Sequence, residues 1–104
     1  MQDVNQHESE SVSLAAAMLL LETPQEVDSF LKDLCTPNEI NALRERWRVC
    51  QLLAAQQLSY REIHKVTGAS LTTISRVARF LKDEANNGYL QLLSKLTRER
   101  NIKK

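Results

Sequence analysis

The sequence predicts an all-α protein, and three observations lead to that class. Only two glycines, two prolines and five aromatic residues occur in 104 residues, whereas Leu, Ala, Gln, Glu and Arg, which favour helices, are abundant. Apolar residues recur at spacings of three and four, and no stretch alternates with the period of a strand. Finally, the start signals of helices recur along the chain. Together these predict six helices.

The first two helices are expected between residues 13 and 34. Ser13 can cap a short helix that ends near Leu21. Thr23, followed by proline and by Glu26 three residues on, has the spacing of a capping box and begins the second helix. The apolar residues of that helix recur at helical spacing: Val27, Phe30, Leu31 and Leu34.

The third helix is the longest, from Pro37 to about Gln56. Thr36 and Glu39 form its capping box, and no glycine or proline interrupts it. One stripe of its surface is expected to face the core: Ile40, Leu43, Trp47, Cys50 and Leu53/Ala54.

Three further helices follow. Ser59 and Glu62 begin one of about eight residues, which Gly68 ends because glycine takes the positive φ found just past many helices. Ser70 caps the next, which runs to about Glu84. Residues 86–88 break the chain again, and a last amphipathic helix carries Tyr89, Leu92, Leu93 and Leu96.

The expected organisation is one helical domain over residues 13–100, between a flexible segment, 1–12, and a basic tail, 101–104. Charge is divided unevenly: residues 1–34 hold seven acidic residues and one lysine, a net charge of −6, whereas residues 59–82 carry +4. An acidic start joined to a basic centre suggests that the centre meets a polyanion. Charges that only solvate helices would give the same pattern.

Several classes of protein are excluded. Cys35 and Cys50 lie among apolar residues and are expected to be buried free thiols, and His7 and His64 are too isolated for a metal site. No nucleophile-base set or phosphate loop occurs, so we expect no enzyme. Residues 12–21 are apolar but too short to span a bilayer, and the acidic N-terminus is not a signal peptide. We expect a cytoplasmic, nucleoid-associated bacterial protein that binds no membrane.

Residues 59–82 have the parts of a helix-turn-helix. The first helix places Ile63 and Val66 at core spacing, and Gly68 lies in a four-residue turn. On the second helix, one arc is apolar and is expected to face the core: Leu71, Ile74, Val77, Ala78 and Leu81.

The opposite arc of that second helix carries Thr72, Ser75, Arg76 and Arg79, with Thr73 towards its edge. Hydroxyls can bond phosphates or base edges, and arginine can grip guanine or neutralise phosphate. No Asp or Glu occurs between residues 65 and 82. This predicts a helix that enters the major groove, although an ordinary αα-hairpin would share each separate feature.

These motifs also resemble a known family. The stretch from residue 35 to 81 is similar to the Trp repressor family, and the likeness extends over about residues 14–96. The branch it resembles within the family is YerC/YecD-like. The residues that carry the likeness are Cys35-Thr36-Pro37-Asn38-Glu39, Arg46, Tyr60-Arg61-Glu62-Ile63, Thr67-Gly68-Ala69-Ser70 and Thr73-Ile74-Ser75-Arg76, with Asp33-Leu34-Cys35-Thr36 and Gly88-Tyr89 pointing to the branch.

The resemblance implies an intertwined homodimer whose two recognition helices enter successive major grooves roughly 34 Å apart. It places Arg61, Thr72, Thr73 and Ser75 where the family contacts DNA. The exposed arc makes Arg76 a further DNA contact, and from it we add Arg79 and Lys82, for which binding only to phosphate or water is the alternative. Apolar stripes outside residues 59–82 agree with a dimer, since they exceed what one short motif can cover.

Members of the family that sense tryptophan hold it between two arginines, which Arg46 and Arg76 match, and Thr36 matches a wall of that pocket. Two departures add bulk: Val77 replaces a glycine and Phe80 replaces a serine. We therefore predict that no cofactor is bound and that these side chains fill the pocket. A different small ligand, tryptophan itself, and simple packing of Phe80 at a dimer interface are the alternatives.

The predicted function is a sequence-specific, dimeric DNA-binding transcription regulator, a repressor that occupies a palindromic operator in double-stranded DNA. One alternative is an architectural DNA binder that does not choose a sequence. Another is a helical protein-interaction module. The sequence does not reveal the operator or the sign of regulation.

Overall fold

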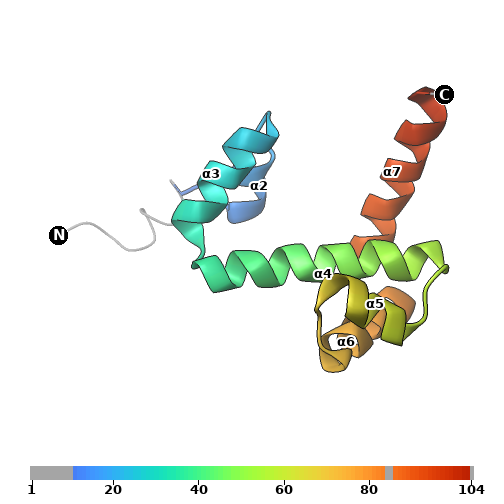
Figure 1. Ribbon diagram of the computed structural model, residues 1–104. Coiled ribbons are helices and arrows are strands. Elements are labelled where there is room, and N and C mark those ends of the chain that lie inside the picture. Colours follow the sequence, from blue (N-terminus) through green and yellow to red (C-terminus); the bar gives the residue numbers. More distant parts are fainter. Residues whose placement is uncertain (1–10, 84–85, 104) are drawn as a thin grey trace. The chain divides into compact units, whose positions relative to one another are not determined.

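The structure, a computed structural model, describes residues 11–83 and 86–103. Its described residues form six helices and no strand, which confirms the all-α prediction (Figure 1). The helices are α2 (Leu14–Met18), α3 (Pro24–Leu34), α4 (Pro37–Ala55), α5 (Tyr60–Thr67), α6 (Leu71–Asp83) and α7 (Gly88–Lys103). Most of the segment predicted to be flexible, residues 1–12, lies outside the described part of the chain.

Predicted caps begin the helices. The hydroxyl of Ser13 accepts a hydrogen bond from the Ala16 amide at 3.1 Å. At α4 the capping box is complete, because the Thr36 amide donates to Glu39 Oε1 at 2.8 Å and the Glu39 amide donates to Thr36 Oγ1 at 3.2 Å. Each such cap stabilises a helix by about 1 kcal/mol, since it satisfies an amide that has no partner within the helix.

Two boundaries and one cap differ from the prediction. The first helix ends at Met18 rather than near Leu21. At α3, Thr23 accepts from the Glu26 amide, but its hydroxyl donates to the Glu26 carboxylate at 3.3 Å, so the reciprocal bond of a capping box does not form. The last helix, α7, continues through Lys103, so the predicted basic tail is helical up to that residue.

The chain divides into two compact units, Met1–Ile40 and Asn41–Lys104, and α4 crosses the division. The prediction of a single domain over residues 13–100 stays a prediction. In the first unit, α2 and α3 contain no buried residue. Large apolar side chains of this unit are exposed instead: Val12, Leu14, Met18, Leu19, Leu20 and Leu34.

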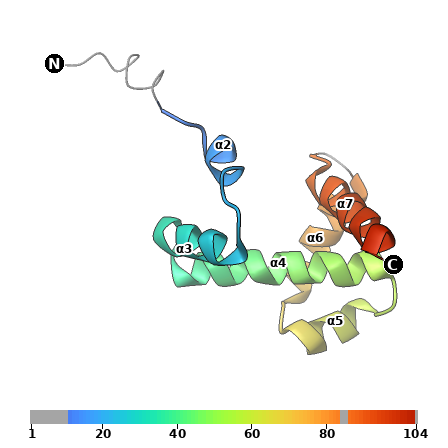
Figure 2. The same cartoon turned by 90° about the horizontal axis from the view of Figure 1, so that it is seen from above.

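The second unit holds the core. α5 and α6 lie beside the C-terminal part of α4, and α7 starts there and extends away from it (Figures 1 and 2). Val49, Cys50, Ile63, Ala69 and Ile74 are each 0% exposed, and Val77 is 1% exposed. Half-buried side chains of α4, α6, α7 and the α4–α5 connection pack around these: Trp47, Leu52, Leu53, Leu58, Leu81, Tyr89 and Leu93.

Four residues expected to face the core are exposed, and one of them is Ala54 of α4. Val66 is 50% exposed, Leu71 is 55% exposed and Leu43 is 45% exposed, so those predictions are wrong for the single chain. Leu71 lies at the edge of its apolar arc, beside the hollow that it lines with the polar residues of α6. On α4 the buried face is turned towards Val49, which the predicted stripe omitted. Helical spacing identifies an apolar side of a helix, but the neighbours decide how wide its buried part is.

Candidate nucleic-acid interface and adjoining pocket

The first helix of the predicted helix-turn-helix has well-defined ends. Ser59 and Glu62 form a complete capping box: the Ser59 amide donates to Glu62 Oε1 at 3.0 Å, and the Glu62 amide donates to Ser59 Oγ at 3.1 Å. Hydrogen bonding to the Glu62 carboxylate, first from the Ser59 backbone amide and second from the Ser59 side chain, lowers the pKa of Glu62 below its ordinary 4.5. The helix ends at Gly68, whose φ of +77° is the left-handed conformation that glycine adopts without strain.

The turn between α5 and α6 is held by two side chains whose roles the sequence analysis missed. Thr67 Oγ1 donates to the Ile63 carbonyl at 2.7 Å and accepts from the Ala69 amide at 3.0 Å. Nδ1 of His64 lies 2.6 Å from the Ala69 carbonyl. Because a carbonyl only accepts, Nδ1 must carry the proton in this bond. The fully buried Ala69 thus has both its amide and its carbonyl bonded to α5 side chains.

The predicted recognition face lies on α6. Thr72, Ser75, Arg76 and Arg79 are all exposed, and with Leu71 they line an open hollow of about 510 Å³. Hydroxyls and guanidiniums therefore share one accessible face, and Leu71 adds an apolar contact for a thymine methyl group. Lys82 is exposed farther along the same helix.

Arg61 and Thr73 lie apart from this hollow. Arg61 is exposed in the first turn of α5. Thr73 is half-buried: its amide donates to Ser70 Oγ at 3.0 Å, and its hydroxyl accepts from the Ser70 hydroxyl at 3.1 Å. The Ser70 side chain thus caps α6 through the Thr73 amide and also occupies one acceptor site of the Thr73 hydroxyl.

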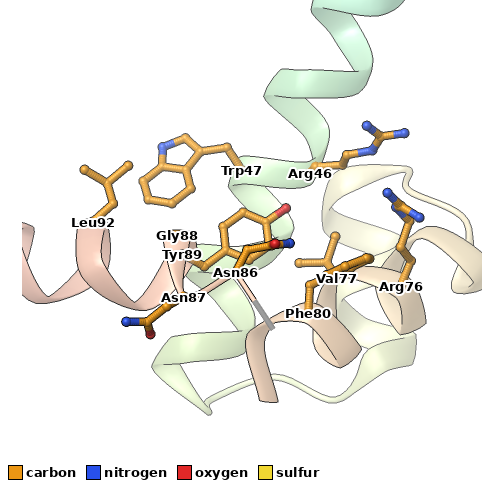
Figure 3. Close-up of a pocket in the computed structure, with 10 residues that line it drawn as sticks. All are labelled: Arg46, Trp47, Arg76, Val77, Phe80, Asn86, Asn87, Gly88, Tyr89 and Leu92. Atoms are coloured by element: carbon orange, nitrogen blue, oxygen red, sulfur yellow. The ribbon is translucent and has the colours of Figure 1, made fainter. Parts of the chain in front are cut away.

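A pocket of about 440 Å³ adjoins the other flank of α6 (Figure 3). Arg46 and Arg76 lie at one end of it, and Trp47 and Leu92 lie at the other. Its lining comes from α4, α6, α7 and the residues just before α7: Arg46, Trp47, Arg76, Val77, Phe80, Asn86, Asn87, Gly88, Tyr89 and Leu92.

Four of the five residues predicted for a ligand pocket thus meet: Arg46, Arg76, Val77 and Phe80. The fifth, Thr36, belongs to the first unit, where its hydroxyl caps α4. Val77 is buried, whereas Phe80 is half-buried at the pocket's edge. Sequence reasoning missed Asn86, Asn87 and Tyr89 as pocket residues, although the chain break at 86–88 had marked them as a special segment.

Two ionisable groups at or near the pocket, Tyr89 and Cys50, have raised pKa values. Burial raises the pKa of Tyr89 above its ordinary 10.0, and the neighbouring Cys50 thiol adds to this, while Arg46 and Arg76 act in the opposite direction. Burial also raises the pKa of Cys50 to about 11. Its thiol is therefore neutral and is a poor nucleophile at pH 7.

In the described part of the chain, histidines, cysteines and carboxylates form no group of three that could hold a metal ion. No helix of that part combines the length and the apolar character needed to cross a membrane.

The sequence is similar both to a family model and to a known bacterial protein. The family model described as Trp repressor protein matches residues 10–97. The uncharacterised protein YerC of Bacillus subtilis strain 168 is 39% identical over 80 residues, which are 77% of this chain and 75% of that protein.

Two solved structures share the fold. A TrpR-like protein from Eubacterium eligens ATCC 27750 is 36% identical, covers 90% of this chain and 88% of its own, and has a TM-score of 0.71. A candidate Trp repressor from Staphylococcus aureus is 35% identical, covers 92% and 89%, and has a TM-score of 0.74. The chain therefore belongs to the Trp repressor family, and this membership indicates a DNA-binding regulator.

Proposed function

We propose that the protein is a sequence-specific transcription regulator that represses by occupying a palindromic operator as a homodimer. In this role it is not an enzyme, and it acts in the cytoplasm on the nucleoid. The observation that carries the proposal is the exposed face of α6, where four polar side chains line one hollow: Thr72, Ser75, Arg76 and Arg79. The turn that precedes α6 is held in place by the hydrogen bond between His64 and Ala69. Such a face offers donors to phosphates and base edges with no carboxylate from residue 65 to 82 to repel them.

The division of labour on this face follows from chemistry. Arg76 and Arg79 can bond guanine bidentately or neutralise phosphates, whereas Thr72 and Ser75 make shorter-range contacts. Arg61, exposed in the first turn of α5, is proposed as a further contact to DNA. Because several cations take part, affinity must fall steeply as the salt concentration rises. An apolar helical interface with a protein partner would lack that dependence.

The homodimer is supported by the first unit. Leu14, Leu19 and Leu20 are 54%, 86% and 73% exposed, and neither α2 nor α3 has a buried residue. A patch of this kind is normally covered in solution, because leaving large apolar groups in water forgoes roughly 1.5–3 kcal/mol for each. A second copy of the chain is the proposed cover, and it would also supply a second recognition helix for the other half-site.

The regulator is further proposed to act without tryptophan or any other cofactor. Val77 and Phe80 line the pocket, and although about 440 Å³ of it stays open, each is bulkier than the glycine or serine that the family resemblance would place there. Isothermal titration with tryptophan is then expected to give no saturable heat. A saturable heat at micromolar concentration would show that the pocket, with Arg46 and Arg76 at its end, still accepts the amino acid. Other small ligands can be screened by the same method.

Selection of binding sites from a random duplex pool tests the function directly. The wild type is expected to enrich a palindrome with half-sites about one helical turn apart. Thr73→Ala and Arg76→Ala should change or abolish that enrichment. Arg98→Ala, which removes an exposed arginine of α7, is the charge-matched control and should retain it.

Two other outcomes would contradict the proposal. If the pool binds but no sequence is enriched, the protein is an architectural binder that does not choose a sequence. If the pool does not bind even at low salt, the helix-turn-helix does not act on DNA.

A further inference from the structure

Phe80 contacts two arginines of the proposed recognition face at once. The Arg76 guanidinium carbon lies 4.8 Å from the centroid of the Phe80 ring, and that of Arg79 lies 5.6 Å from it. Both distances fall within the range of about 6 Å in which an aromatic ring attracts a cation. Arg76 is also one helical turn before Phe80, the spacing at which side chains meet on a helix surface.

The ring lies between the two sites described above. It lines the pocket together with Arg76 and Val77, while Arg76 and Arg79 line the hollow of the recognition face. Arg76 belongs to both sites, so the ring touches the recognition face through it (Figure 3). Phe80 is half-buried and both arginines are exposed, which leaves their donors accessible to DNA.

Two physical consequences follow from this arrangement. A free arginine side chain samples many rotamers, and fixing it on DNA has an entropic cost, which prior contact with a ring reduces. The two guanidiniums also repel each other, and the negative face of the ring offsets part of that repulsion. The ring does not use the N–H donors of either arginine, because the attraction is to the charge as a whole.

We propose that Phe80 is a positioning residue that holds Arg76 and Arg79 ready for DNA. The inference rests on the proposed function and adds to it the residue that orders the recognition face from within the chain. Phe80 itself touches no base or phosphate. It acts through the two arginines.

The test compares Phe80→Leu with Phe80→Tyr on the duplex selected by the wild type. Leucine preserves an apolar side chain but lacks the aromatic face, and is expected to weaken binding roughly fivefold to twentyfold at fixed salt. Tyrosine keeps the face and is expected to recover most of the affinity. Phe80→Leu binding as tightly as the wild type would overturn the inference while leaving the proposed function intact.

A double-mutant cycle separates positioning from a loss of packing. In an Arg76→Ala, Arg79→Ala background, Phe80→Leu should no longer reduce DNA affinity, because the ring has nothing left to position. An undiminished loss in that background would show that Phe80 acts only by packing, and would contradict the proposal. Thermal unfolding of each variant is measured alongside, so that affinities are compared only between folded proteins.

A readout without DNA keeps the two proposals distinguishable. In the NMR spectrum of the free protein, the Nε–Hε signals of Arg76 and Arg79 should be displaced by the ring current, and Phe80→Leu should return them to ordinary positions. Unchanged signals would overturn the contact between the ring and the arginines. If the wild type does not bind DNA, the proposed function is overturned, and the contact between Phe80 and the arginines then has no role in DNA binding.

Discussion

Residues 41–104 bury Val49, Cys50 and Ile63 completely, whereas in the described part of residues 1–40 only Ile40, at 7% exposure, is buried. Helices of both units begin with a side-chain N-cap, so the presence of a cap does not separate the two units. What differs is whether the apolar sides of the helices find each other within one chain. Helices become stable chiefly through such packing. Within the single chain, the second unit therefore buries a core, whereas the first leaves its large apolar side chains exposed.

The largest effect should come from the core of the second unit. Ile74→Ala removes a side chain that is 0% exposed and is expected to lower the free energy of unfolding by about 2–5 kcal/mol. Leu71→Ala on the same helix removes a side chain that is 55% exposed and should cost well under half of that. Urea denaturation followed by circular dichroism measures both. Equal losses would mean that Leu71 is covered in solution.

The next largest effect concerns the exposed apolar side chains of the first unit, which the proposed dimer would bury. Leu20→Ser should raise the dissociation constant of the dimer by roughly tenfold, about 1.4 kcal/mol, because Leu20 is 73% exposed in the single chain and is expected to be buried against the second copy. Analytical ultracentrifugation over a range of concentrations measures it. Val66→Ser, which alters an exposed apolar residue of the second unit, is the control and should leave the dimer unchanged. A wild type that sediments as a monomer would remove the basis of the comparison.

A smaller effect should follow from removing the hydrogen bond that His64 makes in the turn between α5 and α6. His64→Ala leaves the carbonyl of the buried Ala69 without its 2.6 Å partner, and should reduce the free energy of unfolding by about 1 kcal/mol. Lys65→Ala, at an exposed position of the same helix, is expected to leave stability nearly unchanged. Denaturation curves of the two variants decide the matter, and coincident curves would show that the bond contributes nothing.

The smallest effect concerns the cap of α5 and depends on pH. Since hydrogen bonds from Ser59 lower the pKa of Glu62 below 4.5, its charge stabilises the fold fully above that pH, and this contribution is lost as the pH falls through the lowered pKa. Glu62→Gln removes the charge but keeps an acceptor. The melting temperature of the wild type should exceed that of the variant above pH 4.5, and the gap should narrow in more acidic solution. A gap that stays constant with pH would contradict this account.

Much of the fold could be predicted because its signals are local. A cap joins residues three apart, as in Ser59 with Glu62, and Gly68 takes its positive φ within a single residue. The core positions of α6 at Ile74, Val77 and Ala78 also followed from the helical period. For the same reason the exposed face with Thr72, Ser75, Arg76 and Arg79 could be identified from spacing alone.

Tertiary structure decided what depends on residues far apart in the chain. The sequence by itself determined the six helices, the turn and the polar face, because each rests on contacts within a few residues. It did not determine that Val66 and Leu71 would be exposed, or that Tyr89 of α7 would join Arg46 and Arg76 around one pocket. The contact of His64 with Ala69 also required the path of the folded turn. Burial and pocket lining are properties of the neighbours that a side chain meets, and a helical period specifies only the direction in which it points.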